Sequence, residues 1–376
     1  MKIRAAVLNE MGAALPYARS RPLRIEEVEL EAPGQGEVLV RMGAAGLCHS
    51  DLSVINGDRP RPTPMALGHE AAGVVEAVGP GVDDLRKGDH VVLVFIPSCG
   101  HCNPCAEGRP ALCENGAASN TAGTLLSGAR RIFREGGGGP INHHMGCSAF
   151  AEAAVVSRRS CVKVDPALPL EEAALFGCAV LTGVGAVVNT AQVRAGSSVA
   201  VVGLGGVGLA SVLGAVASGA RRVVAIDVSD EKLALASSLG ATDGFNATDP
   251  DVVDRVKKAT GGGVDFAIEM AGSTRAFETA YRVTRRGGTT VTAGLPNPTA
   301  TWPMSPTHLV AEERTIKGSY IGTCVPQRDL PRYIELYLRG KLPVDRLMSG
   351  RLTLEQVNEG FDRLHEGKAV RQVLVF

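Results

Sequence analysis

The sequence has no excess of charge of either sign. Its 39 lysine and arginine residues balance 39 aspartate and glutamate residues, and neither sign forms a sustained run. A basic stripe is the electrostatic footprint of proteins that bind nucleic acid or anionic membranes. The balance therefore argues against both kinds of partner.

Long apolar runs are also missing. No uninterrupted apolar stretch reaches the 18 residues of a membrane helix, and the opening residues, MKIRAAVLNEMGAAL, lack the apolar core of a secretory signal. We therefore expect a cytoplasmic protein. In that compartment, nine cysteines indicate metal binding or catalysis rather than disulfides.

The pattern of predicted elements changes along the chain, and 376 residues suffice for two domains. Residues 1 to about 95 predict short β-strands without regular helices between them, and residues 114–142 predict a long surface loop. From about residue 170, helix and strand alternate, as in a parallel sheet. We expect an α/β protein in which a doubly wound domain, residues 180–320, is inserted into a β-rich domain, residues 1–179 plus 321–376.

The stretch from Val199 to Asp227 predicts a dinucleotide-binding unit. An apolar run is followed by Gly203-x-Gly205-x-x-Gly208, a helical pattern and a second apolar run that ends on Asp227. The glycines allow a tight turn, a close approach of the backbone to a pyrophosphate, and close packing of helix on strand. The pyrophosphate would lie at the helix N-terminus. Asp227, 19 residues after Gly208, would accept hydrogen bonds from the ribose and favours NAD over NADP.

Four cysteines in a turn-rich loop predict a structural zinc site. They follow the spacing Cys99-x-x-Cys102-x-x-Cys105-x7-Cys113. Four thiolates complete a tetrahedral zinc shell and leave no position open for substrate. An iron–sulfur cluster is the weaker alternative, because the ferredoxin spacing is absent.

Three further residues predict a catalytic zinc site. Cys48 in GLCHSD, His69 in LGHEAAG and Cys178 in LFGCAVLTG each lie in a turn flanked by glycine. Taken singly, each has an ordinary alternative: a surface histidine, or an inert thiol in the core. Taken together with a dinucleotide domain they form a Cys₂His set, which leaves one zinc position open. The remaining cysteines are predicted to be small buried hydrophobic residues: Cys147, Cys161 and Cys324.

These motifs carry a family resemblance over almost the whole chain. The matching pieces are GLCHSD, GHEAAGVVEAVG, GDHVVLVFIPSCGHCNPC, GCAVLTG, VVGLGGVGLA, AIDVSDEKLALASSLGAT and AVRQVLVF. The chain resembles a zinc-dependent alcohol dehydrogenase of the medium-chain dehydrogenase/reductase superfamily. The resemblance implies a GroES-like catalytic domain beside the Rossmann domain, two zinc ions per chain, and reversible hydride transfer between a primary or aromatic alcohol and NAD. It also implies a homodimer, paired through strands near residues 300–320, with a tetramer as the alternative.

The resemblance also implies roles for single residues. Around the catalytic zinc, Glu70 would stand behind the metal or bind it transiently, Asp51 would orient the ligating histidine, and Ser50 would take the alcohol proton. The residues expected to contact the cofactor are Gly203, Gly205, Gly206, Val207, Gly208, Asp227, Lys232, Thr182, His49, Leu295 and Arg371. The residues expected to line the substrate pocket are Phe95, Leu295 and Ile321.

Some positions depart from the family pattern. Ser53 stands where many members have a proton-relay histidine, and His49 stands where many have an arginine on the pyrophosphate. Ala117 replaces the arginine of the glutathione-dependent branch. The alternative activity is therefore a formaldehyde dehydrogenase that uses a different carrier thiol. A zinc-ribbon module that binds nucleic acid is the alternative outside enzymes, and the balanced charge argues against it. Segment 11–22 is longer than usual and suggests no function.

Overall fold

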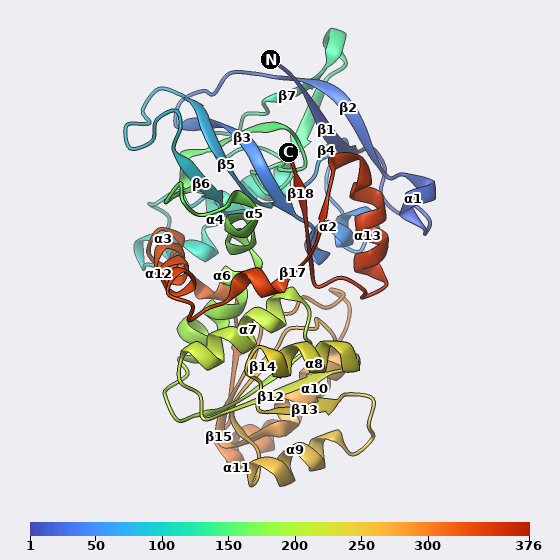
Figure 1. Cartoon of the computed structure of the whole chain (residues 1–376), viewed down its shortest axis with the longest axis vertical. Coiled ribbons are helices and arrows are strands. Elements are labelled where there is room, and N and C mark those ends of the chain that lie inside the picture. Colours follow the sequence, from blue (N-terminus) through green and yellow to red (C-terminus); the bar gives the residue numbers. More distant parts are fainter. The chain divides into compact units, whose positions relative to one another are not determined.

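The computed structural model describes all 376 residues, and the chain divides into two compact units (Figure 1). The first unit comprises Met1–Cys178, Val325–Arg332 and Met348–Phe376; the second comprises Ala179–Cys324 and Tyr333–Leu347. Residues 333–347 thus pack with the second unit, whereas the sequence grouped them with the β-rich domain. The predicted domain bounds, 180–320 and 1–179 plus 321–376, remain a prediction.

The first unit contains a closed barrel with strand order β1-β2-β7-β8-β4. Its strands are β1 (Lys2–Leu8), β2 (Leu23–Leu30), β7 (Ile132–Arg134), β8 (Pro140–His143) and β4 (Met65–Ala66). Alternate residues of a strand point to one face, so Ile3, Ala5 and Val7 of β1 enter the same core as Ile132 and Ile141. The prediction of one long surface loop over 114–142 is therefore wrong, because β7 and β8 close the barrel and α4 (Glu114–Ala122) precedes them.

A second sheet in the first unit has the strand order β10-β6-β5-β3-β18-β17, and β9 also pairs with β3. Its strands are β10 (Cys161–Val164), β6 (His90–Leu93), β5 (Glu70–Val78), β3 (Glu37–Gly46), β18 (Arg371–Val375), β17 (Met348–Leu352) and β9 (Ala153–Ser157). The last strand of the chain, β18, pairs with the end of β3, so that Val373 lies opposite Gly46. The C-terminal segment thereby completes a sheet begun near the N-terminus.

The helices of the first unit are short. They are α1 (Tyr17–Ser20), α2 (His49–Ile55), α3 (Asn103–Ala106), α4, α5 (Leu170–Ala174), α13 (Val357–His365) and the first part of α12 (Pro326–Leu338). The presence of α2 corrects the prediction that no regular helix separates the N-terminal strands. The segment 11–22, for which the sequence suggested no function, contains α1, whose first residue, Tyr17, is buried.

The second unit contains six parallel strands in the order β13-β12-β11-β14-β15-β16. The strands are β11 (Ser198–Val202), β12 (Arg222–Asp227), β13 (Asp243–Asn246), β14 (Val264–Glu269), β15 (Thr284–Thr292) and β16 (Thr315–Gly318). The helices are α6 (Ala179–Gly185), α7 (Gly206–Ala217), α8 (Asp230–Ser238), α9 (Val252–Thr260), α10 (Thr274–Val283) and α11 (Pro306–Glu312). This order is that of the doubly wound dinucleotide-binding fold, in which ligands bind at the carboxyl ends of the strands. The predicted fold class is confirmed.

One helical run, Leu170–Ala191, is long and apolar enough to cross a membrane, with a mean hydropathy of 1.7. However, 83% of the apolar 18-residue window in this run is buried inside the fold. The run is therefore a core element, and it contains α5 and α6.

Candidate metal centres and cofactor site

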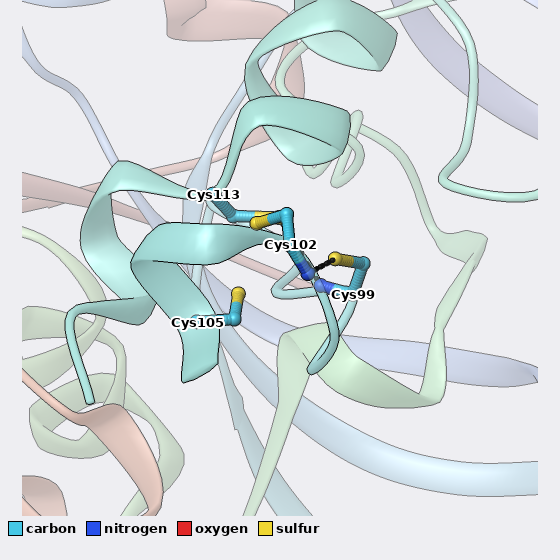
Figure 2. A group of neighbouring side chains, drawn as sticks. All are labelled: Cys99, Cys102, Cys105 and Cys113. Atoms are coloured by element: carbon cyan, nitrogen blue, oxygen red, sulfur yellow. Dashed lines mark hydrogen bonds between the residues drawn. The ribbon is translucent and has the colours of Figure 1, made fainter. Parts of the chain in front are cut away.

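Four cysteine sulfurs gather in the loop that follows β6, as Figure 2 shows. The ligand atoms of Cys99, Cys102, Cys105 and Cys113 all lie within 4.8 Å of one another. Local structure presents them, because Cys102 precedes α3 and Cys113 precedes α4. The set predicted from the sequence is thus brought together in full.

Backbone amides point at two of these sulfurs. Cys99 Sγ accepts the N–H of Cys102 at 3.3 Å, and Cys113 Sγ accepts the N–H of Gly116 at 3.3 Å. Burial would raise the pKa of Cys99, but the N–H groups of His101 and Cys102 stabilise its thiolate and lower the pKa to about 6. Burial raises the pKa of Cys105 to about 12. Some of these thiols ionise readily and others do not, so the four cannot all become thiolates without a compensating positive charge. A divalent cation would supply that charge.

A second cluster is fully enclosed in the first unit. One ligand atom each from Cys48, His69, Glu70 and Cys178 lies within 4.8 Å of the others, and all four side chains are buried. Cys48 is the N-cap of α2, where the chain leaves β3; His69 and Glu70 stand where β5 begins. Gly68, before His69, has φ +94°, and a Cβ there would lie 2.5 Å from the backbone nitrogen of Phe150. Only glycine permits this entry into β5.

Asp51 fixes the orientation of the histidine in this cluster. Its Oδ1 lies 2.9 Å from His69 Nδ1, and its Oδ2 accepts the N–H of Cys48 at 3.2 Å. A carboxylate only accepts hydrogen bonds, so His69 donates from Nδ1, and Nε2 is the nitrogen left to bind a metal ion in place of a proton. That Nε2 is buried and has no hydrogen-bond partner in the fold. An imidazole held in this way, with one buried nitrogen unpaired, has the arrangement of a metal ligand.

Hydrogen bonds, burial and neighbouring charges all shift the pKa values in this cluster. The hydrogen bond between the two thiols lowers the pKa of Cys48 well below its ordinary value and raises that of Cys178. Burial would lower the pKa of His69, but the Asp51 carboxylate raises it well above its usual range. Burial raises the pKa of Glu70 to about 7, although Arg371 opposes this. The cluster therefore holds more acidic groups than can all ionise together, and a bound cation would relieve that conflict.

Glu70 connects the cluster to the last strand. Its Oε2 lies 3.1 Å from Arg371 Nη1, which also donates to the carbonyl of Leu47, while its Oε1 is buried without a partner. Arg371 itself is 4% exposed. Its predicted contact with the pyrophosphate remains a prediction, and within the fold it is the counter-ion of Glu70.

The glycine motif lies between β11 and α7 in the second unit. Gly203 has φ +91°, and a Cβ on Gly208 would lie 1.8 Å from the Gly203 carbonyl oxygen, so strand and helix pack closely there. A Cβ on Gly205 would meet nothing within 4 Å, which leaves its backbone open to a ligand at the start of α7. Asp227 Oδ2 accepts the N–H of Leu204 at 2.6 Å. Asp227, at the end of β12, therefore also stabilises the backbone of the glycine loop.

The other predicted residues differ in burial. Phe95 packs edge-on against His69, with ring centroids 5.1 Å apart, and Ile321 is buried in the second unit. Leu295 is 56% exposed. The remaining residues singled out in the sequence all lie on helices: His49, Ser50 and Ser53 on α2, Ala117 on α4, Thr182 on α6, Gly206 and Val207 on α7, and Lys232 on α8. Of these, His49 and Ala117 are exposed. The remaining cysteines, Cys147, Cys161 and Cys324, are buried as predicted.

Comparisons with known proteins agree with this geometry. Residues 34–166 match the alcohol dehydrogenase GroES-like domain, and residues 206–339 match the zinc-binding dehydrogenase family. The chain is 41% identical to the NDMA-dependent alcohol dehydrogenase of Amycolatopsis methanolica, over 100% of this chain and 99% of the relative. The chain belongs to the zinc-dependent alcohol dehydrogenases.

Solved structures of other proteins extend the comparison. An alcohol dehydrogenase zinc-binding domain protein from Burkholderia ambifaria superposes with a TM-score of 0.94 at 38% identity, covering 100% of this chain and 99% of that one. Benzyl alcohol dehydrogenase from Acinetobacter calcoaceticus gives a TM-score of 0.93 at 32% identity, with the same coverage. As a zinc-dependent alcohol dehydrogenase, this chain is an oxidoreductase that acts on small alcohols or aldehydes.

Sequence reasoning missed one residue beside the buried cluster of Cys48, His69, Glu70 and Cys178. His144 is buried, and its Nδ1 lies 3.2 Å from the same Asp51 oxygen that contacts His69. Asp51, His69 and His144 therefore form a third close group of potential ligands. The signal was the pair His143–His144 next to a glycine turn, but nothing in that spacing connects it to Asp51, almost a hundred residues earlier.

Proposed function

We propose that this enzyme transfers a hydride reversibly between a primary or aromatic alcohol and NAD. Cys48, His69 and Cys178 would hold a catalytic zinc ion, with Glu70 as a transient ligand. A structural zinc ion would be held by Cys99, Cys102, Cys105 and Cys113. The observation that carries the proposal is the buried cluster in which His69 Nε2 and Glu70 Oε1 are both left without partners.

The donor sets suit zinc in two different ways. The cysteine loop offers four sulfurs, a complete tetrahedral shell, whereas the buried cluster offers two sulfurs and one nitrogen, which leaves a position for substrate. Bound zinc supplies Lewis acidity that favours loss of the alcohol proton, and NAD supplies the hydride acceptor.

Ser50 is proposed to receive the alcohol proton. It is two residues beyond Cys48 on α2, and a hydroxyl can accept one proton while it donates another. The hydroxyl of Ser53 donates to the Ser50 carbonyl at 2.9 Å, so it is engaged within the helix. Water or exposed His49 would then carry the proton to solvent, and Phe95 would give the pocket an apolar wall.

NAD is proposed as the cofactor because of Asp227. Its two oxygens accept the backbone N–H groups of Leu204 and Ser229, at 2.6 and 2.9 Å, which fixes the carboxylate at the end of β12. A 2′-phosphate at that position would meet a fixed negative charge. The further cofactor contacts remain proposals from the family resemblance: Thr182, Val207, Lys232, Leu295, His49 and Arg371.

The activity is tested by following NADH absorbance with benzyl alcohol and with short primary alcohols. Expected is turnover with NAD and no added thiol. Turnover of formaldehyde only in the presence of a thiol would favour the alternative, a thiol-adduct formaldehyde dehydrogenase. Because one relative is named for its dependence on NDMA, a parallel assay contains NDMA; activity that requires it would contradict the use of free NAD as the electron acceptor.

The metal assignment is tested by elemental analysis. Purified enzyme should contain two zinc ions per chain, and Cys48→Ala should contain one. The matched control is Cys147→Ala, a buried thiol outside both clusters, which should keep two. Two zinc ions in Cys48→Ala would contradict the catalytic site.

A homodimer is proposed from the edge of the parallel sheet. Strand β16 is the last strand in its sheet, and none of its residues is buried. The edge of a sheet presents unpaired backbone N–H and C=O groups, which a strand of a second subunit could pair with. Light scattering should give twice the chain mass; a monomer would contradict the proposal, and a tetramer would revise it. The cytoplasmic location expected from the sequence remains a prediction.

A further inference from the structure

His144 contacts the carboxylate that orients the proposed zinc ligand His69. Both histidines direct Nδ1 to Asp51 Oδ1, at 2.9 Å from His69 and 3.2 Å from His144. The longer contact lacks the alignment of a full hydrogen bond, and both ring nitrogens of His144 have no aligned partner. His144 is thus a buried imidazole that lies beside the Asp51 carboxylate.

The ring of His69 is confined by its neighbours. The His144 ring meets it edge-on, with centroids 5.7 Å apart and planes at 87°, and Phe95 meets it at 85°. Together with Asp51 these rings leave His69 little freedom to rotate. Because a ligating nitrogen must be held within about half an ångström of its productive position, the neighbours of His69 bear directly on metal affinity.

The loop after His144 is held in an unfavourable conformation. Met145 and Ser148 have φ of +49° and +50°, a region that costs non-glycine residues roughly 1 kcal/mol each. Ser148 Oγ accepts the N–H of His144 at 3.1 Å, and the Ser148 N–H donates to the His144 carbonyl at 3.2 Å. The strained turn therefore fixes the backbone of His144.

An apolar side chain would fill this position at lower cost. Burying a polar ring without aligned partners is unfavourable. The feature that the imidazole provides and an apolar residue lacks is a polar ring nitrogen 3.2 Å from Asp51 Oδ1.

We propose that His144 is a positioning residue that holds Asp51 against His69 and thereby strengthens binding of the catalytic zinc ion. This inference rests on the proposed function, because it requires zinc at Cys48, His69 and Cys178. His144 acts through Asp51 and does not ligate the metal.

The experiment compares three substitutions of His144 in the zinc-loaded, full-length enzyme. His144→Asn places an amide N–H near the position of Nδ1, His144→Gln places it near the position of Nε2, and His144→Phe keeps a ring without a donor. The readout is the rate at which zinc transfers to a chromophoric chelator. The four-cysteine site serves as the internal reference in every sample, since it should release zinc at the wild-type rate.

Removing a group behind a metal ligand typically costs about 10- to 100-fold in metal affinity. We expect His144→Phe and His144→Gln to lose the catalytic zinc at least about tenfold faster than wild type, and His144→Asn to stay within about threefold. With cobalt(II) at the catalytic site, the d–d absorption bands should shift in the first two variants and not in His144→Asn.

Equal rates in Asn and Gln variants would overturn the inference, as would unchanged zinc release in His144→Phe. If His144→Phe fails to fold, the Asn–Gln comparison still decides, because both side chains are polar amides that differ in where the N–H lies. A wild-type enzyme without zinc at the catalytic cluster would instead refute the proposed function.

Discussion

Acid should destabilise this enzyme through one buried histidine, His143. Its Nε2 accepts the N–H of Arg131 at 3.0 Å, and its Nδ1 lies 3.3 Å from Ser148 Oγ. Burial, and after it the charges of Arg130 and Arg131, lower the pKa of His143 to about 3. An unfolded chain would restore a pKa near ~6.5.

The direction of this pH dependence follows from proton uptake by the unfolded state. Between pH 6.5 and 3 the unfolded state binds a proton at this residue and the native state does not, so the free energy of unfolding falls as pH falls. The slope approaches about 1.4 kcal/mol per pH unit, and from pH 7.5 to 5.5 the integrated loss is about 1.4 kcal/mol. His143→Gln keeps an acceptor for the Arg131 N–H and removes the titration, so its stability should lack this part of the pH dependence.

The assay is equilibrium urea unfolding of wild type and His143→Gln at intervals between pH 7.5 and 5.5. Other groups also titrate in this range, but they are common to both proteins and cancel in the difference. The exposed His365 on α13 provides the matched control, and His365→Gln should follow wild type. If the free energies of wild type and His143→Gln keep a constant difference across the range, His143 is not the neutral buried group that the structure describes.

Three further predictions concern the reaction and its cofactor. Ser50→Ala should lose about 10²-fold or more in kcat, the usual range for a positioned proton transfer; near-normal turnover with hydride transfer still rate-limiting would contradict the role of Ser50. Ser53→His should raise kcat at neutral pH or move the rise in activity to lower pH, because an imidazole can relay the proton; an unmoved pH–rate profile would show that no relay is needed there. Asp227→Asn should narrow the preference in kcat/KM for NAD over NADP by at least about fivefold, since removal of one charge is worth about 1 kcal/mol even in water; an unchanged ratio would remove Asp227 from cofactor discrimination.

Residues with strict spacing were the most predictable parts of this molecule. The four-cysteine loop and the glycine motif are local, so their spacing alone indicates a zinc loop and a strand–turn–helix unit. The parallel sheet was predictable because helical and strand patterns alternate from about residue 170, as they do in doubly wound folds. Cys48, His69 and Cys178 are far apart in sequence, so no spacing connects them, and they could be grouped only by their residue types and the neighbouring dinucleotide domain.

What the sequence could not provide depends on contacts between distant segments. Strands β7 and β8 have three and four residues, too few to show an alternating pattern, and they are strands because the barrel closes through them. Helix α2 has seven residues, and its N-terminal signal is unusual because the cap is Cys48 rather than serine or threonine. His144 has no recognisable spacing to Asp51, and its position depends on how β8 ends.

The capping of α2 has a consequence for how metal occupancy can be observed. A seven-residue helix is far below the length at which helices persist alone in water, so its local stability depends on its first turn. There the Cys48 sulfur accepts the N–H of Asp51, and the Asp51 carboxylate accepts the N–H of Cys48. The atoms that begin the helix are thus a proposed zinc ligand and the partner of another. Loss of the ion would change the charge and position of both caps, so amide hydrogen exchange along Leu52–Ile55 would report whether the buried cluster is loaded, in the absence of any substrate.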